Sequence, residues 1–325
     1  MDSITPIFLL SLPRSGSTLL QRLLAVHEAI ATTTEPWVLL PLVYARRRNG
    51  SFSEYSQWRS FIAHEDFARS LPGGAAQDRQ ELATYVRRLY RAAAGPEPAY
   101  FLDKTPRYSL IAEDLLELFP DAGFIYLWRN PVAAAASMMQ TWAGGRWNLD
   151  EHAVDFYRGL PRMIAAQQVH PDRIHCVQYE RLLTDPHGTL EDVFRAIGLG
   201  YDPSITDRFA DVTLEGRFGD QRGVKAYRTV SRDPLEKWKP TMGNAIRRRW
   251  ARRYLRWLGW ERLAVMGYDM DALLDELNSA PRNTRFLLSD AVRRATSRFT
   301  AVFDPNLLQS RRMRSDGDGP RIGHS

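Results

Sequence analysis

A short polar turn, Pro-Arg-Ser-Gly-Ser-Thr at residues 13–18, joins an apolar segment to a predicted helix, Ser17–Val26. The turn brings backbone N–H groups, hydroxyls and one guanidinium to the start of that helix. Unsatisfied donors and the helix dipole favour an anion at this position. We therefore predict a phosphate-binding loop. The residues expected to contact the phosphate are Arg14, Ser15, Gly16, Ser17 and Thr18.

A second apolar segment, Gly123–Trp128, is followed by Arg129, and Pro131 then opens a helix that reaches Ser137. An arginine at a strand end presents a bidentate fork, and a hydroxyl two turns into the next helix lies on the same side. This pair is suited to a second phosphate. The two segments together predict a ligand that carries two separate phosphate groups.

Both segments differ from an ATP site with magnesium. The Walker pattern places Gly-Lys-Ser/Thr after a glycine and four residues. Here the cation, Arg14, precedes the glycine, and the second strand ends at Arg129 where magnesium would require an aspartate. The shorter loop suits one phosphate better than a triphosphate.

Together the two segments resemble the sulfotransferase family that uses 3′-phosphoadenosine-5′-phosphosulfate (PAPS), most closely its tyrosylprotein and Golgi carbohydrate branch. In that family a Pro-(Lys/Arg)-Ser-Gly-(Ser/Thr)-Thr loop holds the 5′-phosphosulfate, and Arg14 to Thr18 match it. An arginine at a strand end, with a serine eight positions later, holds the 3′-phosphate, as Arg129 and Ser137 are spaced here. The resemblance covers about residues 4–270. It implies PAPS as cosubstrate and no metal.

The resemblance also implies catalytic residues. Glu35, twenty-one residues after Arg14, stands where the tyrosylprotein branch has its catalytic glutamate, and is the expected general base. Lys104, in Asp-Lys-Thr-Pro, matches a lysine that approaches the transferred sulfuryl group. Arg14 completes the expected catalytic set. The alternative roles are a helix-start glutamate beside Pro36 and an exposed loop cation at Lys104.

Further PAPS contacts are implied by later segments. Tyr179, followed by Glu180, resembles a Tyr-Glu pair that lines the adenine side. The stretch from 217 to 238 resembles a loop that closes over PAPS, with Arg222, Lys225 and Arg228 as candidates between which the sequence does not choose. The tyrosylprotein branch has one more arginine in its 3′-phosphate helix, where this chain has Thr141.

The predicted function is transfer of the sulfuryl group of PAPS to a hydroxyl. A P-loop ATP-dependent kinase or NTPase and a non-catalytic phosphonucleotide-binding protein remain alternatives. The acceptor stays open, with a carbohydrate, lipid or small natural product favoured over protein tyrosine. Residues 41–80, anchored by Trp58 and Phe61, and the loop 142–150 are candidate acceptor walls. Tryptophans that are candidates for stacking on an acceptor are Trp37, Trp58, Trp142 and Trp147.

Alternating strand and helix patterns predict an α/β fold with a parallel sheet of about four or five strands flanked by helices, P-loop-NTPase-like. The expected strands are Ile7–Leu12, Ile30–Thr33, Tyr100–Asp103, Phe124–Trp128 and Arg173–Tyr179. The expected helices are Ser17–Val26, Gln80–Ala93, Leu110–Leu118, Val132–Thr141, Leu149–Gln168, Thr189–Ile197, Gly243–Leu258 and Met270–Leu277.

Composition agrees with one enzyme domain, residues 1–280, in a chain of 325 residues. The single cysteine, Cys176, is expected in a buried strand, and the histidines show no metal-ligand spacing. Phe8–Leu12 is too short for a signal peptide or membrane span, so we expect a cytoplasmic, bacterial-like protein. The net charge of +6 fits an anionic cosubstrate, and no nucleic-acid module is present.

A C-terminal amphipathic helix is expected at 281–305, followed by a disordered tail at 306–325. Its apolar stripe consists of Leu288, Val292, Ala295, Phe299 and Val302. Such a stripe packs on its own domain, on a second subunit as a homodimer, or on an anionic membrane. We favour docking on protein, and the sequence leaves the oligomeric state open.

Overall fold

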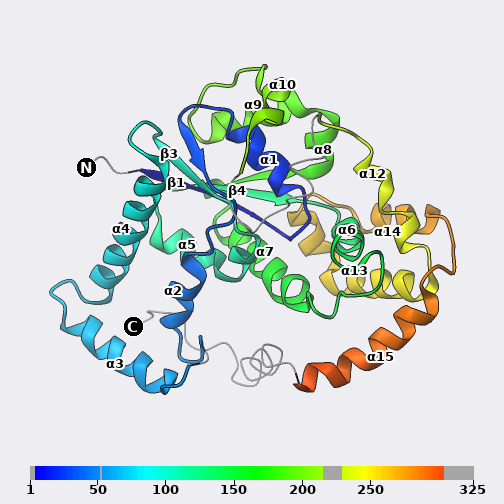
Figure 1. Cartoon of the computed structure of the whole chain (residues 1–325), viewed down its shortest axis with the longest axis horizontal. Helices are drawn as coiled ribbons and strands as arrows, with labels where there is room; N and C mark the ends of the chain where they lie inside the picture. Colours follow the sequence, from blue (N-terminus) through cyan, green and yellow to red (C-terminus); the bar gives the residue numbers. More distant parts are fainter. Residues whose placement is uncertain (1–3, 52, 215–228, 304–325) are drawn as a thin grey trace.

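Five parallel strands form one sheet in the order β2-β3-β1-β4-β5 (Figure 1). The computed structural model describes residues 4–51, 53–214 and 229–303. The strands are β1 Thr5–Ser11, β2 Ile30–Thr32, β3 Tyr100–Asp103, β4 Gly123–Trp128 and β5 Ile174–Gln178. All five expected strands are present, each within two residues of its predicted bounds, and the predicted α/β class is confirmed.

Helices cover both faces of the sheet (Figure 1). The helices are α1 Ser17–Leu24, α2 Leu39–Ala45, α3 Gln57–Ser70, α4 Gly74–Ala94, α5 Ala112–Leu118, α6 Pro131–Ala143, α7 Leu160–Val169, α8 Tyr179–Thr184, α9 Pro186–Ala196, α10 Ile205–Arg208, α12 Pro234–Lys237, α13 Ala245–Val265, α14 Met270–Ser279 and α15 Leu287–Phe303.

Alternate side chains of β1 point to opposite faces of the sheet, and the core therefore has two layers. Ile7 and Leu9 pack with residues of α1, α8 and α9 on one face. Phe8 and Leu10 pack with residues of α4, α5, α6, α7 and α13 on the other face. A central strand that is buried on both faces has a continuous run of apolar residues in its sequence, and β1 has this pattern. The carboxyl ends of the strands therefore open between the two layers, where ligands of such sheets bind.

Several helix bounds differ from the expected ones. α7 begins at Leu160, not at Leu149, because residues 149–152 form turns and a π-helical turn, Asp155–Gly159, precedes the helix. α13 runs past Leu258 to Val265, with a break at Gly259, whose φ of 79° is a conformation that glycine adopts easily. α8 was not expected, because its six residues are too few for a clear periodicity.

The segment 41–80 is more regular than expected. It contains part of α2, all of α3 and the start of α4. Trp58 is 48% exposed, so the prediction that it anchors this segment is wrong. Phe61 is half-buried. The anchors of this region are instead the fully buried Leu39 and Val43 of α2, which pack in the core.

Cys176 is exposed, which corrects the expectation of a buried residue. Its strand, β5, lies at the edge of the sheet, so its sides are not equally covered. The indole N–H of Trp128 donates a hydrogen bond to Cys176 Sγ over 3.2 Å. The expectation that β5 is a strand is confirmed, and only the burial of this residue was misjudged.

The C-terminal helix α15 docks on the domain through a polar residue. Asp290 is fully buried and forms an ion pair with Arg247 of α13 at 2.6 Å. The expected apolar stripe is not the docking face, since Leu288 is 83% exposed and Val292 is 61% exposed. The predicted tail 306–325 lies outside the described residues.

Candidate active site

The predicted phosphate loop is a tight turn between β1 and α1. Arg14 and Gly16 have φ of 65° and 91°, in the left-handed region, which turns the chain sharply into the helix. Ser15, Ser17 and Thr18 are buried around it. Gly16 stands at the N-cap, and no side chain of the described residues caps α1 there. The first backbone N–H groups of α1 are therefore available to an anion bound in this loop.

Tyr179 covers this loop. A Cβ atom placed on Gly16 would lie 2.2 Å from Tyr179 Cε2, closer than any real contact. Glycine is therefore required at position 16 for two reasons, its φ and the tyrosine ring. The structure brings together the loop after β1 and Tyr179, the residue that follows β5.

Arg129 joins the same cluster. Its Nη1 atom donates a hydrogen bond to the carbonyl oxygen of Arg14 over 2.6 Å, and its guanidinium lies 4.4 Å from the centre of the Tyr179 ring. Arg129 is 8% exposed, and its Nε has no hydrogen-bond partner among the described residues. Ser137 lies two turns further along α6 and is half-buried. A buried donor without a partner is uncommon, and an anionic ligand would satisfy it.

Glu35 and Lys104 form an ion pair. Lys104 Nζ lies 2.8 Å from Glu35 Oε1, and the two side chains are 2% and 13% exposed. The indole N–H of Trp37 donates to the other oxygen, Oε2, over 3.1 Å. Both oxygens of the Glu35 carboxylate therefore have a partner. The alternative role of Lys104 as an exposed loop cation is wrong, because its side chain is buried.

Asp103, the last residue of β3, fixes the segment that carries Lys104. Its carboxylate accepts hydrogen bonds from Tyr90 at 2.6 Å, Tyr108 at 3.0 Å and Thr105 at 2.9 Å. Burial raises the pKa of Asp103 to about 6, although these donors act in the opposite direction. The network holds the backbone on both sides of Lys104.

The helix α1 is tied to the segment before Glu35. Gln21, fully buried in α1, donates from Nε2 to Thr32 Oγ1 over 2.8 Å and to the carbonyl oxygen of Thr33 over 2.6 Å. Thr32 Oγ1 in turn donates to the carbonyl oxygen of Leu102 over 2.6 Å. The phosphate loop, the Glu35 segment and the Lys104 segment are therefore parts of one hydrogen-bonded unit.

A second buried carboxylate lies beside the Lys104 segment. Arg107 Nε is 2.7 Å from Asp155 Oδ1, and Asp155 is fully buried in the π-helical turn. Burial raises the pKa of Asp155 to about 6. Burial, with a smaller effect of Arg107, lowers the pKa of His152 to about 4. The half-exposed ring of Trp142 lies 4.5 Å from the His152 ring. Asp155 belongs to none of the motifs in the sequence.

A cavity of about 410 Å³ adjoins Arg129 and Tyr179. Glu180 lines it, and its two oxygens accept hydrogen bonds from Asn130 N at 3.0 Å and Tyr268 OH at 2.6 Å. Glu276 of α14 also lines it, with a pKa raised by burial. Sequence reasoning missed Tyr268 and Glu276 because they follow a long helix and belong to no motif.

Three residues predicted to contact PAPS lie outside the described residues. Arg222, Lys225 and Arg228 lie in 215–228, which the structure does not describe. Within the described part of the chain, no group of His, Cys, Asp and Glu side chains is arranged to hold a metal ion. None of the described helices has the length and apolarity needed to cross a membrane.

Comparison with known proteins supports the sequence pattern. The chain is 32% identical over 261 residues to nodulation protein NoeE of Sinorhizobium fredii, which covers 71% of this chain and 59% of that protein. It is 29% identical over 158 residues to the omega-hydroxy-beta-dihydromenaquinone-9 sulfotransferase Stf3 of Mycobacterium tuberculosis, which covers 41% of this chain and 39% of that protein. The chain thus spans less than two thirds of either relative.

Among solved structures, the sulfotransferase domain from the curacin biosynthetic pathway is similar with a TM-score of 0.48 and 23% identity, over 74% of this chain and 92% of that chain. The model of the sulfotransferase family matches residues 6–203, more than half of the chain. That range contains the phosphate loop, Glu35, Lys104, Arg129 and Tyr179. The chain belongs to the sulfotransferase family.

Proposed function

We propose that this protein transfers the sulfuryl group of PAPS to a hydroxyl of a carbohydrate, lipid or small natural product. The observation that carries the proposal is the Lys104–Glu35 pair, at 2.8 Å, in the same hydrogen-bonded unit as the phosphate loop. A base and a cation beside an anion site are what transfer to a hydroxyl requires.

The residues present fit PAPS. In the proposal Arg14, Ser15, Gly16, Ser17 and Thr18 hold the 5′-phosphosulfate at the start of α1. Arg129 and Ser137 hold the 3′-phosphate, for which the buried Nε of Arg129 is a donor without a partner among the described residues. Tyr179 packs between the two phosphate sites. Arg222, Lys225 and Arg228 remain candidates for a further contact to PAPS, and all three lie outside the described residues.

PAPS supplies an activated sulfuryl group, whose transfer passes through a loose, charge-separated transition state similar to that of phosphoryl transfer. Glu35 accepts the proton of the acceptor hydroxyl through one carboxylate oxygen. Lys104 and Arg14 donate to the oxygens on which negative charge develops. Positioning and charge neutralisation therefore account for most of the rate.

The Lys104–Glu35 contact gives this proposal an order of events. Glu35 cannot accept a proton efficiently while Lys104 donates to Oε1 and Trp37 donates to Oε2. A phosphosulfate competes with the carboxylate for the ammonium group. We propose that Lys104 turns from Glu35 to the phosphosulfate, which leaves Oε1 available to the acceptor hydroxyl.

The exposure of the four tryptophans indicates which of them can contact an acceptor. Trp147 is 2% exposed and donates to Asp150, so this candidate for stacking on an acceptor is a core residue. Trp37, Trp58 and Trp142 are exposed enough to contact one. Trp37 is bound to the proposed base, which makes it the first candidate for stacking on a sugar ring or another flat acceptor.

Two measurements test this proposal. Isothermal titration calorimetry should show binding of adenosine 3′,5′-bisphosphate without metal, and much weaker binding of ATP with magnesium. Radiolabelled PAPS, incubated with a metabolite library and the protein, should label a hydroxyl-bearing product. Tight ATP binding would favour a kinase, and bisphosphate binding without transfer would favour a non-catalytic module.

The proposal includes a cytoplasmic location, and a chain with one cysteine needs no oxidising compartment to fold.

A further inference from the structure

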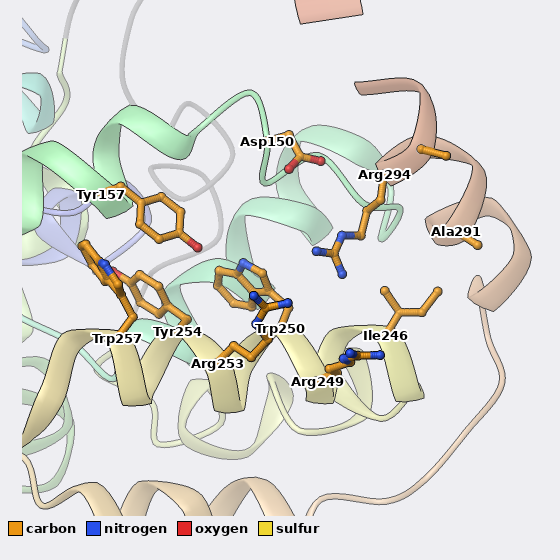
Figure 2. A pocket seen from close by; sticks show the side chains of 11 residues that line it. Asp150, Tyr157, Ile246, Arg249, Trp250, Arg253, Tyr254, Trp257, Ala291 and Arg294 are labelled. Atoms are coloured by element: carbon orange, nitrogen blue, oxygen red, sulfur yellow. The ribbon is translucent and has the colours of Figure 1, made fainter. Parts of the chain in front are cut away.

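A groove of about 930 Å³ lies between α13, α15 and the segment that runs from Asp150 to Tyr157 (Figure 2). None of the described residues assigned above to PAPS or to the proton transfer lines it. The volume is in the range of about 300–1,000 Å³ that is typical of small-molecule sites. The groove is therefore a separate site, and its chemistry can be derived from its own side chains.

Stacked aromatic rings form one side of the groove. The Trp250 and Tyr254 rings are 5.2 Å apart with 4° between their planes, and Tyr254 and Trp257 are 5.7 Å apart with 22° between theirs. These residues follow each other at four and three positions along α13, so they share one face of the helix. Trp257 is 43% exposed. Trp250 and Tyr254 are 7% and 1% exposed, so the rings form an apolar row along the helix in which Trp257 is the exposed member (Figure 2).

The facing wall is also apolar. Ala291 and Ala295 of α15 line the groove. Leu288 and Val292 continue this stripe onto the exposed surface of the same helix, where they are 83% and 61% exposed. Contiguous exposed apolar residues beside a groove are typical of a binding site for an apolar group.

Arginines at the edges give the groove positive charge. Arg249 and Arg253 line it from α13, four residues apart, and both are exposed. Neither has an ion-pair partner among the described residues, and like charges at this spacing repel each other. Arg294 extends toward the groove from α15 (Figure 2). Asp150 is the acidic residue among those that line the groove, and its carboxylate accepts a hydrogen bond from the indole N–H of Trp147.

We propose that this groove binds a single anionic amphiphile, a phosphate or sulfate group carried on a hydrocarbon chain. The head group lies between Arg249 and Arg253, where it neutralises their repulsion. The chain lies over the exposed ring of Trp257, at the end of the row that Trp250 and Tyr254 begin, and against α15. Neither part suffices alone, because the arginines are exposed to water and the rings offer no specific polar partner.

Isothermal titration calorimetry with dodecyl phosphate, below its critical micelle concentration, tests this directly on the full chain. Dodecyl phosphate should bind at least about tenfold more tightly than dodecyl maltoside, and inorganic phosphate should not bind measurably at the same concentrations. Equal binding of the maltoside would overturn the role of the arginines. Equal binding of inorganic phosphate would overturn the role of the rings.

Two pairs of variants locate the site. The double variant R249Q/R253Q should weaken dodecyl phosphate binding by at least about tenfold, whereas R88Q/R195Q, which removes two exposed arginines of α4 and α9, should not. W257A should weaken binding about three- to tenfold, whereas W260A, equally on α13 but outside the groove, should not. Unchanged circular dichroism shows that each variant is folded.

These outcomes are independent of sulfuryl transfer, since binding is measured without PAPS. Wild-type affinity in both R249Q/R253Q and W257A would overturn the proposal. Binding to anionic vesicles without binding of the monomeric amphiphile would also overturn it, because the surface would then recognise a membrane.

Discussion

Lys104 Nζ lies 2.8 Å from Glu35 Oε1, although the two residues are 69 positions apart in the sequence. They meet because β2 and β3 are neighbours in the sheet, with Thr32 opposite Leu102. The pair places the proposed base and the proposed charge-neutralising group in direct contact. Each residue therefore controls the availability of the other, and a variant of either one tests both.

The first prediction concerns Glu35. The variant E35Q should bind adenosine 3′,5′-bisphosphate as the wild type does and lose turnover about a hundredfold or more, because the amide cannot accept the proton. Turnover of labelled PAPS and calorimetry measure the two effects. E28Q, an exposed glutamate of the preceding turn, is the matched control and should be fully active. Normal turnover of E35Q would reduce Glu35 to a structural partner of Lys104.

The second prediction concerns Arg129. R129A should raise the KM for PAPS by at least about tenfold and change the acceptor KM little, because the guanidinium contacts only the cosubstrate side. The variant also loses the hydrogen bond to the Arg14 carbonyl, so the loop should bind less tightly. R181A removes an exposed arginine of α8 and should leave both constants unchanged. An equal rise in both KM values would assign Arg129 to the shape of the whole site.

The third prediction concerns Gly16. G16A adds a methyl group in a left-handed conformation, which costs about 1–2 kcal/mol by itself, and forces it against Tyr179. Its Tm and its affinity for the bisphosphate should both fall. G198A, at φ of 75° with no atom near the added methyl, should show the backbone cost only.

Tyr179 provides a check on this explanation. If the tyrosine ring is the obstacle, the double variant G16A/Y179A should be more stable than the sum of the single effects predicts. Additive losses would mean that the backbone conformation of Gly16 alone sets the cost.

The fourth prediction concerns pH. The pKa of Asp103 is about 6 in the folded protein and near 3.8 when the chain is unfolded, so the folded state binds more protons between these values. The contribution of Asp103 to the unfolding free energy therefore falls by up to about 3 kcal/mol as pH rises from about 4 to 6. Above pH 6 this contribution is constant.

D103N does not titrate and isolates this effect. The difference in unfolding free energy, wild type minus D103N, should decrease over that pH interval, measured by urea denaturation at each pH. A difference that is constant with pH would contradict the raised pKa. D207N, a substitution in α10, is the control and should follow the wild-type profile.

The fifth prediction concerns α15. D290A leaves the buried Arg247 without its ion-pair partner, which should cost about 3–5 kcal/mol. Thermal unfolding should show a clear fall in Tm. D233A removes an exposed ion pair with Lys237 and should leave Tm unchanged. A wild-type Tm for D290A would mean that α15 is not part of the folded domain.

Local pattern was enough to locate the elements that carry the site. The apolar runs before residues 13 and 129, and the Gly and Pro residues after them, predicted the strands β1 and β4 and the helices that follow. At the start of α7 the same reasoning failed, because the π-helical turn before it, with the buried Asp155, interrupts the period on which the reasoning depends. The burial of Trp58 and Cys176 was misjudged because exposure depends on which neighbours cover a surface.

By itself the sequence determined the five strands, the turn at residues 13–18 for which it predicts phosphate binding, and the residue types at positions 35, 104 and 129, because these depend on neighbours along the chain. Only the tertiary structure decided which side chains meet. The contacts between Glu35 and Lys104, and between Gly16 and Tyr179, join segments that are far apart in the sequence. No local periodicity encodes such partners, because strand order and helix packing bring them together only after the whole sheet has formed.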